Sequence, residues 1–148
     1  MNRREFSALL PLLAAAPALA TTQAPTGVAL SSANLESGEF VEGPTRGPSA
    51  TGRTQNRFLS GMLPDNIRLE AHGTALAPGA QPEPIEHHKH TEMWLVREGA
   101  ITLMTAGTQR TIKAGDMGLC IAGDEHSVAN ASKTERASYF VVAVGPPE

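Results

Sequence analysis

The stretch that decides the fold is PEPIEHHKHTEMWLVREG, residues 82–99. It places three of the chain's five histidines between Glu86 and Glu92, and from Met93 onward it becomes an apolar run rich in β-favouring residues. Two interpretations fit this composition. The stretch is either a metal site whose ligands lie close together in the sequence, or a solvated polar loop that is rich in histidine.

The spacing of the polar residues decides what a metal site would require. Side chains two positions apart share one face of a strand. Four candidate ligands have this spacing: Glu86, His88, His90 and Glu92. In a straight strand Glu86 and Glu92 would lie roughly 20 Å apart, at about 3.3 Å per residue, whereas a ligand atom lies about 2 Å from its metal. We therefore expect the chain to turn near positions 89–91, so that Glu92 folds back beside His88.

The rest of the chain after position 57 consists of short apolar runs separated by Gly, Pro and Asp. No run keeps a 3.6-residue apolar period, so we expect little helix. Evenly spaced β-rich segments with turn residues between them predict an all-β sandwich or small barrel. The expected segments are 66–76, 92–99, 100–107, 108–116, 117–124, 126–130 and 136–145.

The N-terminal residues predict an exported protein. MNRREFSALLPLLAAAPALA, residues 1–20, has a basic start, an apolar run and an Ala18-Leu19-Ala20 ending, which is typical of a cleavable signal peptide. Arg3-Arg4 followed by Phe6 matches the twin-arginine (Tat) type of signal. We therefore expect a periplasmic or secreted protein. Residues 21–55 are rich in Thr, Ser, Gly, Pro and Ala and predict a flexible arm, with one short strand near Phe40-Val41. The folded domain is expected over residues 56–148.

Composition excludes several classes of function. The net charge is −3 and no basic patch is interleaved with aromatic residues, so a nucleic-acid partner is not expected. No second apolar run is long enough for stable membrane insertion. The single cysteine, Cys120, lies between apolar residues and is expected to be a buried, unreactive thiol. His72 is expected within a strand and receives no functional role.

Two motifs resemble the paired motifs of the cupin superfamily. The end of the first motif is matched by His88, three residues, Glu92, six residues and Gly99. The second motif is matched at all its expected separations by Gly115, Gly123, His126 and Asn130. The resemblance covers about residues 57–145 and implies the cupin fold, a small β-barrel of the jelly-roll type.

The resemblance also implies a metal centre, with Glu86, His88, Glu92 and His126 as its ligands. The chain departs from the motifs at Glu86, which stands where the family has a histidine. It also departs at Ile121, which stands where the family has a proline, and the leading glycine is displaced to Gly79. His87 is the alternative to Glu86, because a one-residue bulge beside Pro84 would turn it inward. A cupin that has lost its metal is a further alternative.

The expected roles follow from this ligand set. His90 and Trp94 are expected in the substrate pocket, and Trp94 shares the inward parity of its strand with Val96. Glu86 or Glu92 would also serve as a catalytic base. Two imidazoles and two carboxylates favour Mn(II) or Fe(II), while Zn(II), Ni(II) and Cu(II) also accept such ligands.

The resemblance implies a small-molecule metalloenzyme, with a dioxygenase as the leading version. The alternative is a non-catalytic cupin that binds a small molecule or metal for sensing or storage. The resemblance to cupins also implies a homodimer.

Overall fold

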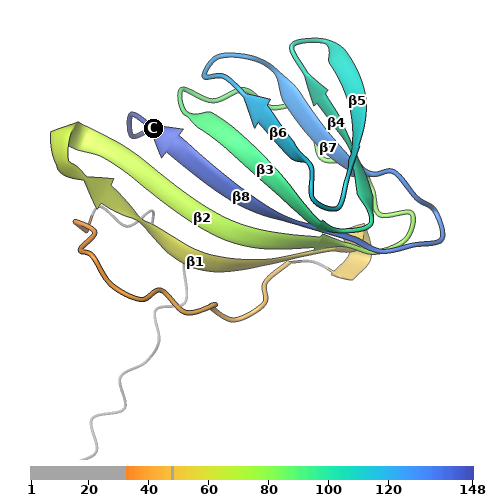
Figure 1. Cartoon of the computed structure of the whole chain (residues 1–148), viewed down its shortest axis with the longest axis horizontal. Coiled ribbons are helices and arrows are strands. Elements are labelled where there is room, and N and C mark those ends of the chain that lie inside the picture. The colour runs from red at the N-terminus through yellow and green to blue at the C-terminus, as the bar shows by residue number, and fades with distance from the viewer. Residues whose placement is uncertain (1–32, 48) are drawn as a thin grey trace, which may run out of the picture.

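The computed structural model describes residues 33–47 and 49–148, so the expected signal peptide, residues 1–20, lies outside the described residues. The secondary structure is almost entirely β (Figure 1). Two short 3-10 helices are present: η1 (Ser49–Thr51) and η2 (Pro64–Asn66). The strands are β1 (Arg53–Leu63), β2 (Ile67–Leu76), β3 (Thr91–Glu98), β4 (Ala100–Thr105), β5 (Thr108–Lys113), β6 (Met117–Cys120), β7 (His126–Asn130) and β8 (Ala137–Gly145).

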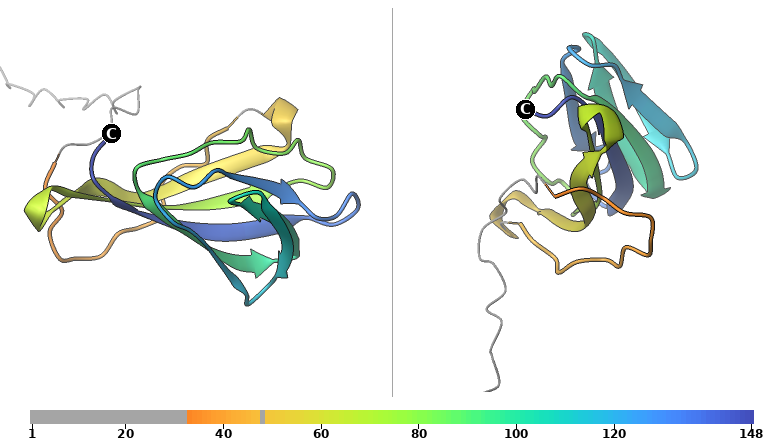
Figure 2. Two further views of the ribbon diagram at one scale, coloured as in Figure 1. Left: turned by 90° about the horizontal axis from the view of Figure 1, so that it is seen from above. Right: turned by 90° about the vertical axis from the view of Figure 1, so that its left-hand side faces the viewer.

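These strands form two antiparallel sheets, which confirms the predicted all-β fold. The larger sheet has the order β1-β2-β8-β3-β6, and the smaller sheet has the order β5-β4-β7. Figure 2 shows both sheets from two further directions. Within the described residues, no helix is long and apolar enough to cross a membrane.

The hydrophobic core lies between the inner faces of the two sheets. Trp94 and Val96 of β3 point into it, as their parity predicts, and are 2% and 1% exposed. The smaller sheet contributes Ile101 and Val128, which are fully buried. Cys120 is buried in the same core, as expected for a thiol that behaves as a small apolar side chain. The core therefore anchors β3, the strand that directly follows the histidine-rich stretch.

One strand and one local expectation differ from the sequence prediction. β1 was not predicted, because Thr, Gln, Asn and Arg interrupt its apolar residues, yet it pairs with β2 along its whole length. The short strand expected near Phe40-Val41 is wrong: both residues are exposed and lie outside any strand. The arm instead contacts β1 through isolated bridges near the two ends of that strand, Asn34 to Met62 and Arg46 to Gln55 (Figure 1).

The tight β3–β4 connection makes a specific stability prediction. Gly99 has a φ of +65°, and a Cβ added there would lie 2.3 Å from the carbonyl oxygen of Arg136. Gly107 has a similar φ of +72° but no atom within 4 Å of an added Cβ. Gly107→Ala should therefore cost only the strain of a left-handed residue, about 1–2 kcal/mol. Gly99→Ala should cost roughly 3 kcal/mol or more, because the clash adds to that strain. Urea unfolding of both variants measures the difference, and equal losses would contradict the predicted clash.

Candidate metal centre

The histidine-rich loop is anchored to the first residue of β7. The backbone N–H of Glu86 donates to the carbonyl of His126 at 3.0 Å, and the N–H of His126 donates back to Glu86 at 2.8 Å. Two residues further on, the N–H of Gly123 donates to the carbonyl of His88 at 2.7 Å. The chain then bends at Lys89-His90 and enters β3. The expected turn is thus present, and it places the loop beside His126.

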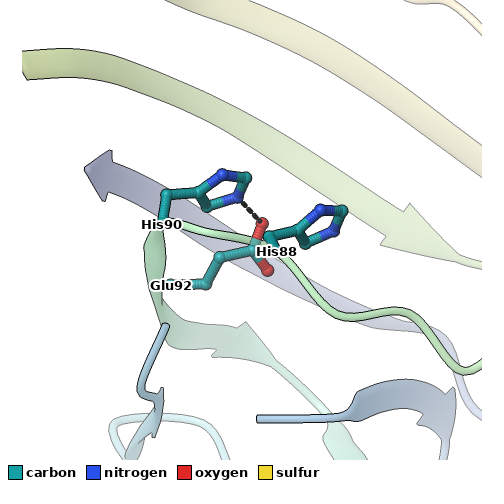
Figure 3. A group of neighbouring side chains, drawn as sticks. All are labelled: His88, His90 and Glu92. Atoms are coloured by element: carbon teal, nitrogen blue, oxygen red, sulfur yellow. Dashed lines mark hydrogen bonds and ion pairs between the residues drawn. The ribbon is translucent and has the colours of Figure 1, made fainter. Parts of the chain in front are cut away.

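Three side chains form a compact group at this turn: His88, His90 and Glu92 (Figure 3). One potential ligand atom from each lies within 4.8 Å of the others. The imidazoles of His88 and His90 are stacked, with ring centroids 4.5 Å apart, and Nε2 of His90 lies 3.1 Å from Oε1 of Glu92. The second oxygen of Glu92 lies 3.3 Å from Nε2 of His126. Glu92 is therefore the centre of the group.

The other expected ligand positions lie at different depths around this centre. His126 is buried, and its ring centroid is 5.3 Å from that of His88. Glu86 lies at the surface, with a side chain that is 55% exposed and a carboxylate oxygen 3.5 Å from Nε2 of His88. His87 is exposed and makes none of the side-chain contacts described for this group. His90, expected as a pocket residue, lies inside the group itself.

The charges within the group are strongly coupled. Burial raises the pKa of Glu92, but hydrogen bonds from His126 and His90 outweigh it and lower that pKa to about 2. The same hydrogen bonds to Glu92 raise the pKa of His126 and the pKa of His90, against the opposing effect of burial. Without a metal, the carboxylate is therefore held ionised between two imidazoles that favour the protonated form.

This coupling predicts how the stability of the metal-free protein depends on pH. The lowered pKa of Glu92 stabilises the fold above pH 4.5, and this contribution is lost as the pH falls from 4.5 towards 2. The raised pKa values of His90 and His126 stabilise the fold below pH 6.5, and that contribution is lost as the pH rises through those values. Glu92→Gln should thus lower the melting temperature of chelator-treated protein most between about pH 4.5 and 6.5. An equal effect at pH 2.5 and pH 5.5 in thermal scans would contradict this.

The donor set fits a divalent metal ion. Zn(II), Mn(II) and similar ions bind imidazole nitrogen and carboxylate oxygen at about 2.0–2.2 Å, so two ligands of one ion lie a few ångströms apart. The spacing within the group of His88, His90 and Glu92 meets this requirement. His126 adds a third imidazole, which is buried and lies 3.3 Å from Glu92. These residues would hold the ion at the mouth of the barrel.

Two adjoining cavities open beside the group. One has a volume of about 140 Å³, and Trp94 forms part of its wall together with His88, Glu92 and His126. The Trp94 ring centroid lies 5.3 Å from that of His126. Trp94 is thus both a core residue and part of the wall of this cavity, in agreement with its inward parity on β3. The second cavity, of about 250 Å³, is lined by His88, His90 and Glu92 from the group.

Several residues of these cavities were not identified from the sequence. Arg68, Glu70 and His72 line the larger cavity from β2, and their alternating spacing on a predicted strand was the signal that they share a face. Glu148 reaches the group from the far end of the chain, with a carboxylate oxygen 3.1 Å from Nδ1 of His90. No local pattern could place Glu148 there, because it lies 58 positions after His90 in the sequence.

The fold and the site together define an all-β barrel with a candidate His-His-Glu metal centre at one end. Residues 74–143 match the family model described as Cupin domain. Residues 74–143 therefore resemble a cupin domain, and the chain has the cupin fold. No curated protein matches the sequence.

Solved structures show the same fold at low sequence identity. The KdgF protein from Halomonas sp. has a TM-score of 0.59 and 18% identity, over 76% of this chain and 96% of that chain. A predicted oxalate decarboxylase from Thermotoga maritima has a TM-score of 0.53 and 21% identity, over 62% of this chain and 78% of that chain. A Cupin 2 conserved barrel domain protein from Salinispora arenicola has a TM-score of 0.51 and 24% identity, over 63% and 76%. At these identities the similarity shows the fold alone.

Proposed function

We propose that this protein is an exported cupin that binds one divalent transition metal and uses it to transform a small molecule. The observation that carries the proposal is the group of His88, His90 and Glu92, which meets His126 beside a cavity. A dioxygenase is the leading version of the activity. The alternative is a binding protein with the same metal centre and no turnover.

The protein side chains have separable roles in this proposal. A bound ion would supply a Lewis acid for a substrate oxygen or, if redox-active, a site for dioxygen. Glu92 and the imidazoles would hold the ion, and Trp94 supplies an apolar part of the cavity wall. Glu86 is 55% exposed beside His88, so its carboxylate is placed to take a proton at the cavity mouth and pass it to solvent.

Mn(II) or Fe(II) is the proposed metal, because a set of mixed imidazole and carboxylate ligands with no thiolate suits these ions. Zn(II), Ni(II) and Cu(II) accept the same donors and bind most sites more tightly. Export of an already folded protein by the twin-arginine route would let the metal be acquired in the cytoplasm first. Elemental analysis of protein recovered after export tests this, and a copper-loaded protein would contradict it.

The decisive experiment separates an enzyme from a binder. Purified protein is loaded with Mn(II), and water-proton relaxation reports whether the ion keeps an exchangeable water. An enzyme should retain such a water, and His126→Ala should abolish dioxygen consumption or turnover. A closed ion with no exchangeable water, or a ligand that binds without turnover, would support the binding protein. Failure to retain any divalent metal would overturn the proposal.

A homodimer is also proposed, and the surface of β6 supports it. β6 lies at the edge of the larger sheet and exposes Met117 and Leu119, next to Leu95 of β3. Exposed apolar side chains on an unpaired edge strand favour association with another chain. Light scattering should give twice the monomer mass, and Leu119→Glu should shift it to the monomer. A monomeric native protein would contradict the proposal.

A further inference from the structure

The end of β8 is packed closely against the turn that carries His90. β8 ends at Gly145, and a Cβ added there would lie 2.6 Å from Cα of His90 and 2.7 Å from its Cβ. Pro146 and Pro147 follow, and proline restricts the backbone dihedral φ to a narrow range. The residues after β8 therefore start from a point fixed beside His90, and they lead directly to Glu148.

Glu148 returns to the same turn with its carboxylate. Its Oε1 accepts a hydrogen bond from the backbone N–H of Lys89 and lies 3.1 Å from Nδ1 of His90. A glutamate carboxylate is ionised near neutral pH and then only accepts hydrogen bonds, so Nδ1 of His90 must carry the proton of this contact. The second oxygen lies 3.8 Å from Nδ1 of His88, which is too far for a hydrogen bond. Glu148 thus acts on the ring of His90.

The other ring nitrogen of His90 faces the metal group. Its Nε2 lies 3.1 Å from Oε1 of Glu92 (Figure 3). Two neighbouring ligands of one ion, each about 2.0–2.2 Å from it, lie roughly 3 Å apart. The separation therefore suits Nε2 and the Glu92 carboxylate as ligands of the same ion. Nε2 can bind only without its proton. A neutral ring that keeps its proton on Nδ1 leaves Nε2 free for this.

The contact between His90 and Glu148 matches a common arrangement in metal sites. A histidine that binds a metal usually donates its second ring N–H to a carboxylate or a carbonyl, which orients the ring and makes the ligating nitrogen more basic. Glu148 occupies that position toward His90. Its side chain is 34% exposed, so it does not fill the core, and its replacement should leave the fold intact.

We propose that Glu148 is a positioning residue for the metal centre: its carboxylate holds the proton of His90 on Nδ1, so that Nε2 is the nitrogen that binds the ion. This inference rests on the proposed function, because it requires a metal at the group of His88, His90 and Glu92. Removal of the acceptor weakens metal binding and lets His90 bind through either nitrogen.

Calorimetric titration of the chelator-treated, full-length protein with Mn(II) separates the hydrogen bond from the charge. Glu148→Ala removes both and should weaken binding about 10- to 100-fold, the usual effect of losing a group that orients a metal ligand. Glu148→Gln removes the charge but keeps an oxygen that accepts, so it should bind about fivefold more tightly than Glu148→Ala. Glu135→Ala removes the same charge from an exposed position just before β8, at the opposite end of that strand, and should stay within about twofold of the native protein.

Nuclear magnetic resonance identifies the nitrogen that binds. Protein with ¹⁵N-labelled histidine is loaded with Zn(II), which has no unpaired electrons, and long-range ¹H–¹⁵N spectra distinguish the protonated ring nitrogen from the metal-bound one. In the native protein His90 should bind through Nε2 and keep its proton on Nδ1. Glu148→Ala should add a second set of His90 signals with Nδ1 bound, and Glu148→Gln should retain mainly the native set. The signals of His90 are those that disappear in His90→Gln.

The outcomes separate this inference from the proposed function. If the native protein binds Mn(II) and Glu148→Ala binds it as tightly or more tightly, the role of Glu148 is overturned while the metal centre stands. Equal losses in Glu148→Ala and Glu148→Gln would also overturn it, because the charge alone would then explain the effect. A native His90 bound through Nδ1 would contradict it as well. A native protein that binds neither Mn(II) nor Zn(II) would overturn both proposals.

Discussion

Replacement of His88 by alanine is expected to weaken Mn(II) binding by about 100-fold or more. Loss of residues that only orient a metal ligand typically costs 10- to 100-fold in affinity, and loss of a ligand should cost at least as much. His88 stacks on the ring of His90 and lies beside Glu86, so its removal takes one candidate ligand from the group. Isothermal titration calorimetry of chelator-treated protein measures the effect directly.

The neighbouring histidine supplies a matched control. His87→Ala removes the same side chain from the adjacent position, where the residue is exposed. We expect its Mn(II) affinity to stay within about twofold of the native protein, since surface substitutions of this kind have small effects. If His87→Ala weakened binding as strongly as His88→Ala, the bulged arrangement with His87 as a ligand would be the correct one.

Replacement of Trp94 by alanine is expected to destabilise the protein by about 3–5 kcal/mol, which is the usual cost of removing a buried tryptophan. Trp94 is 2% exposed and packs within the core between the two sheets. Because domains are stable by only about 5–15 kcal/mol, this change should lower the unfolding midpoint greatly. Denaturant unfolding followed by circular dichroism measures the loss.

The next residue along β3 is the control for this prediction. Leu95 points to the opposite face of the strand and is 43% exposed. Leu95→Ala should change the free energy of unfolding by no more than about 0.5–1 kcal/mol, because it leaves little or no cavity. Similar losses for both variants would mean that the assignment of faces on β3 is wrong.

Much of the fold was determined by local pattern. Seven of the strands were expected from short apolar runs between turn residues, and β7 has the predicted bounds of 126–130. Alternation alone placed Trp94 and Val96 on the inward face of their strand, because successive side chains of a strand point to opposite faces, and both are buried. β1 was not predicted, because its first half carries Arg53, Gln55 and Arg57 at alternate positions, and these resemble the polar residues of the preceding arm.

The candidate ligands were also visible in the sequence, but their grouping was not. Spacing indicated that Glu86, His88, His90 and Glu92 share a parity, and that a bend near position 90 was needed. Which of these candidate ligands meet at Glu92 depends on the directions of their side chains after that bend. Pairing of Glu86 with His126 fixes those directions through two backbone hydrogen bonds across 40 residues.

The sequence by itself thus determined the β-barrel class, the inward face of β3 and the residues from which a metal centre would be drawn, because each depends on contacts between near neighbours. Only the tertiary structure decided which of these residues meet, and it added Arg68, His72 and Glu148 to the cavity beside them. Strand pairing and the path of the final residues bring those side chains to one place, and such long-range pairing leaves no local trace in the sequence.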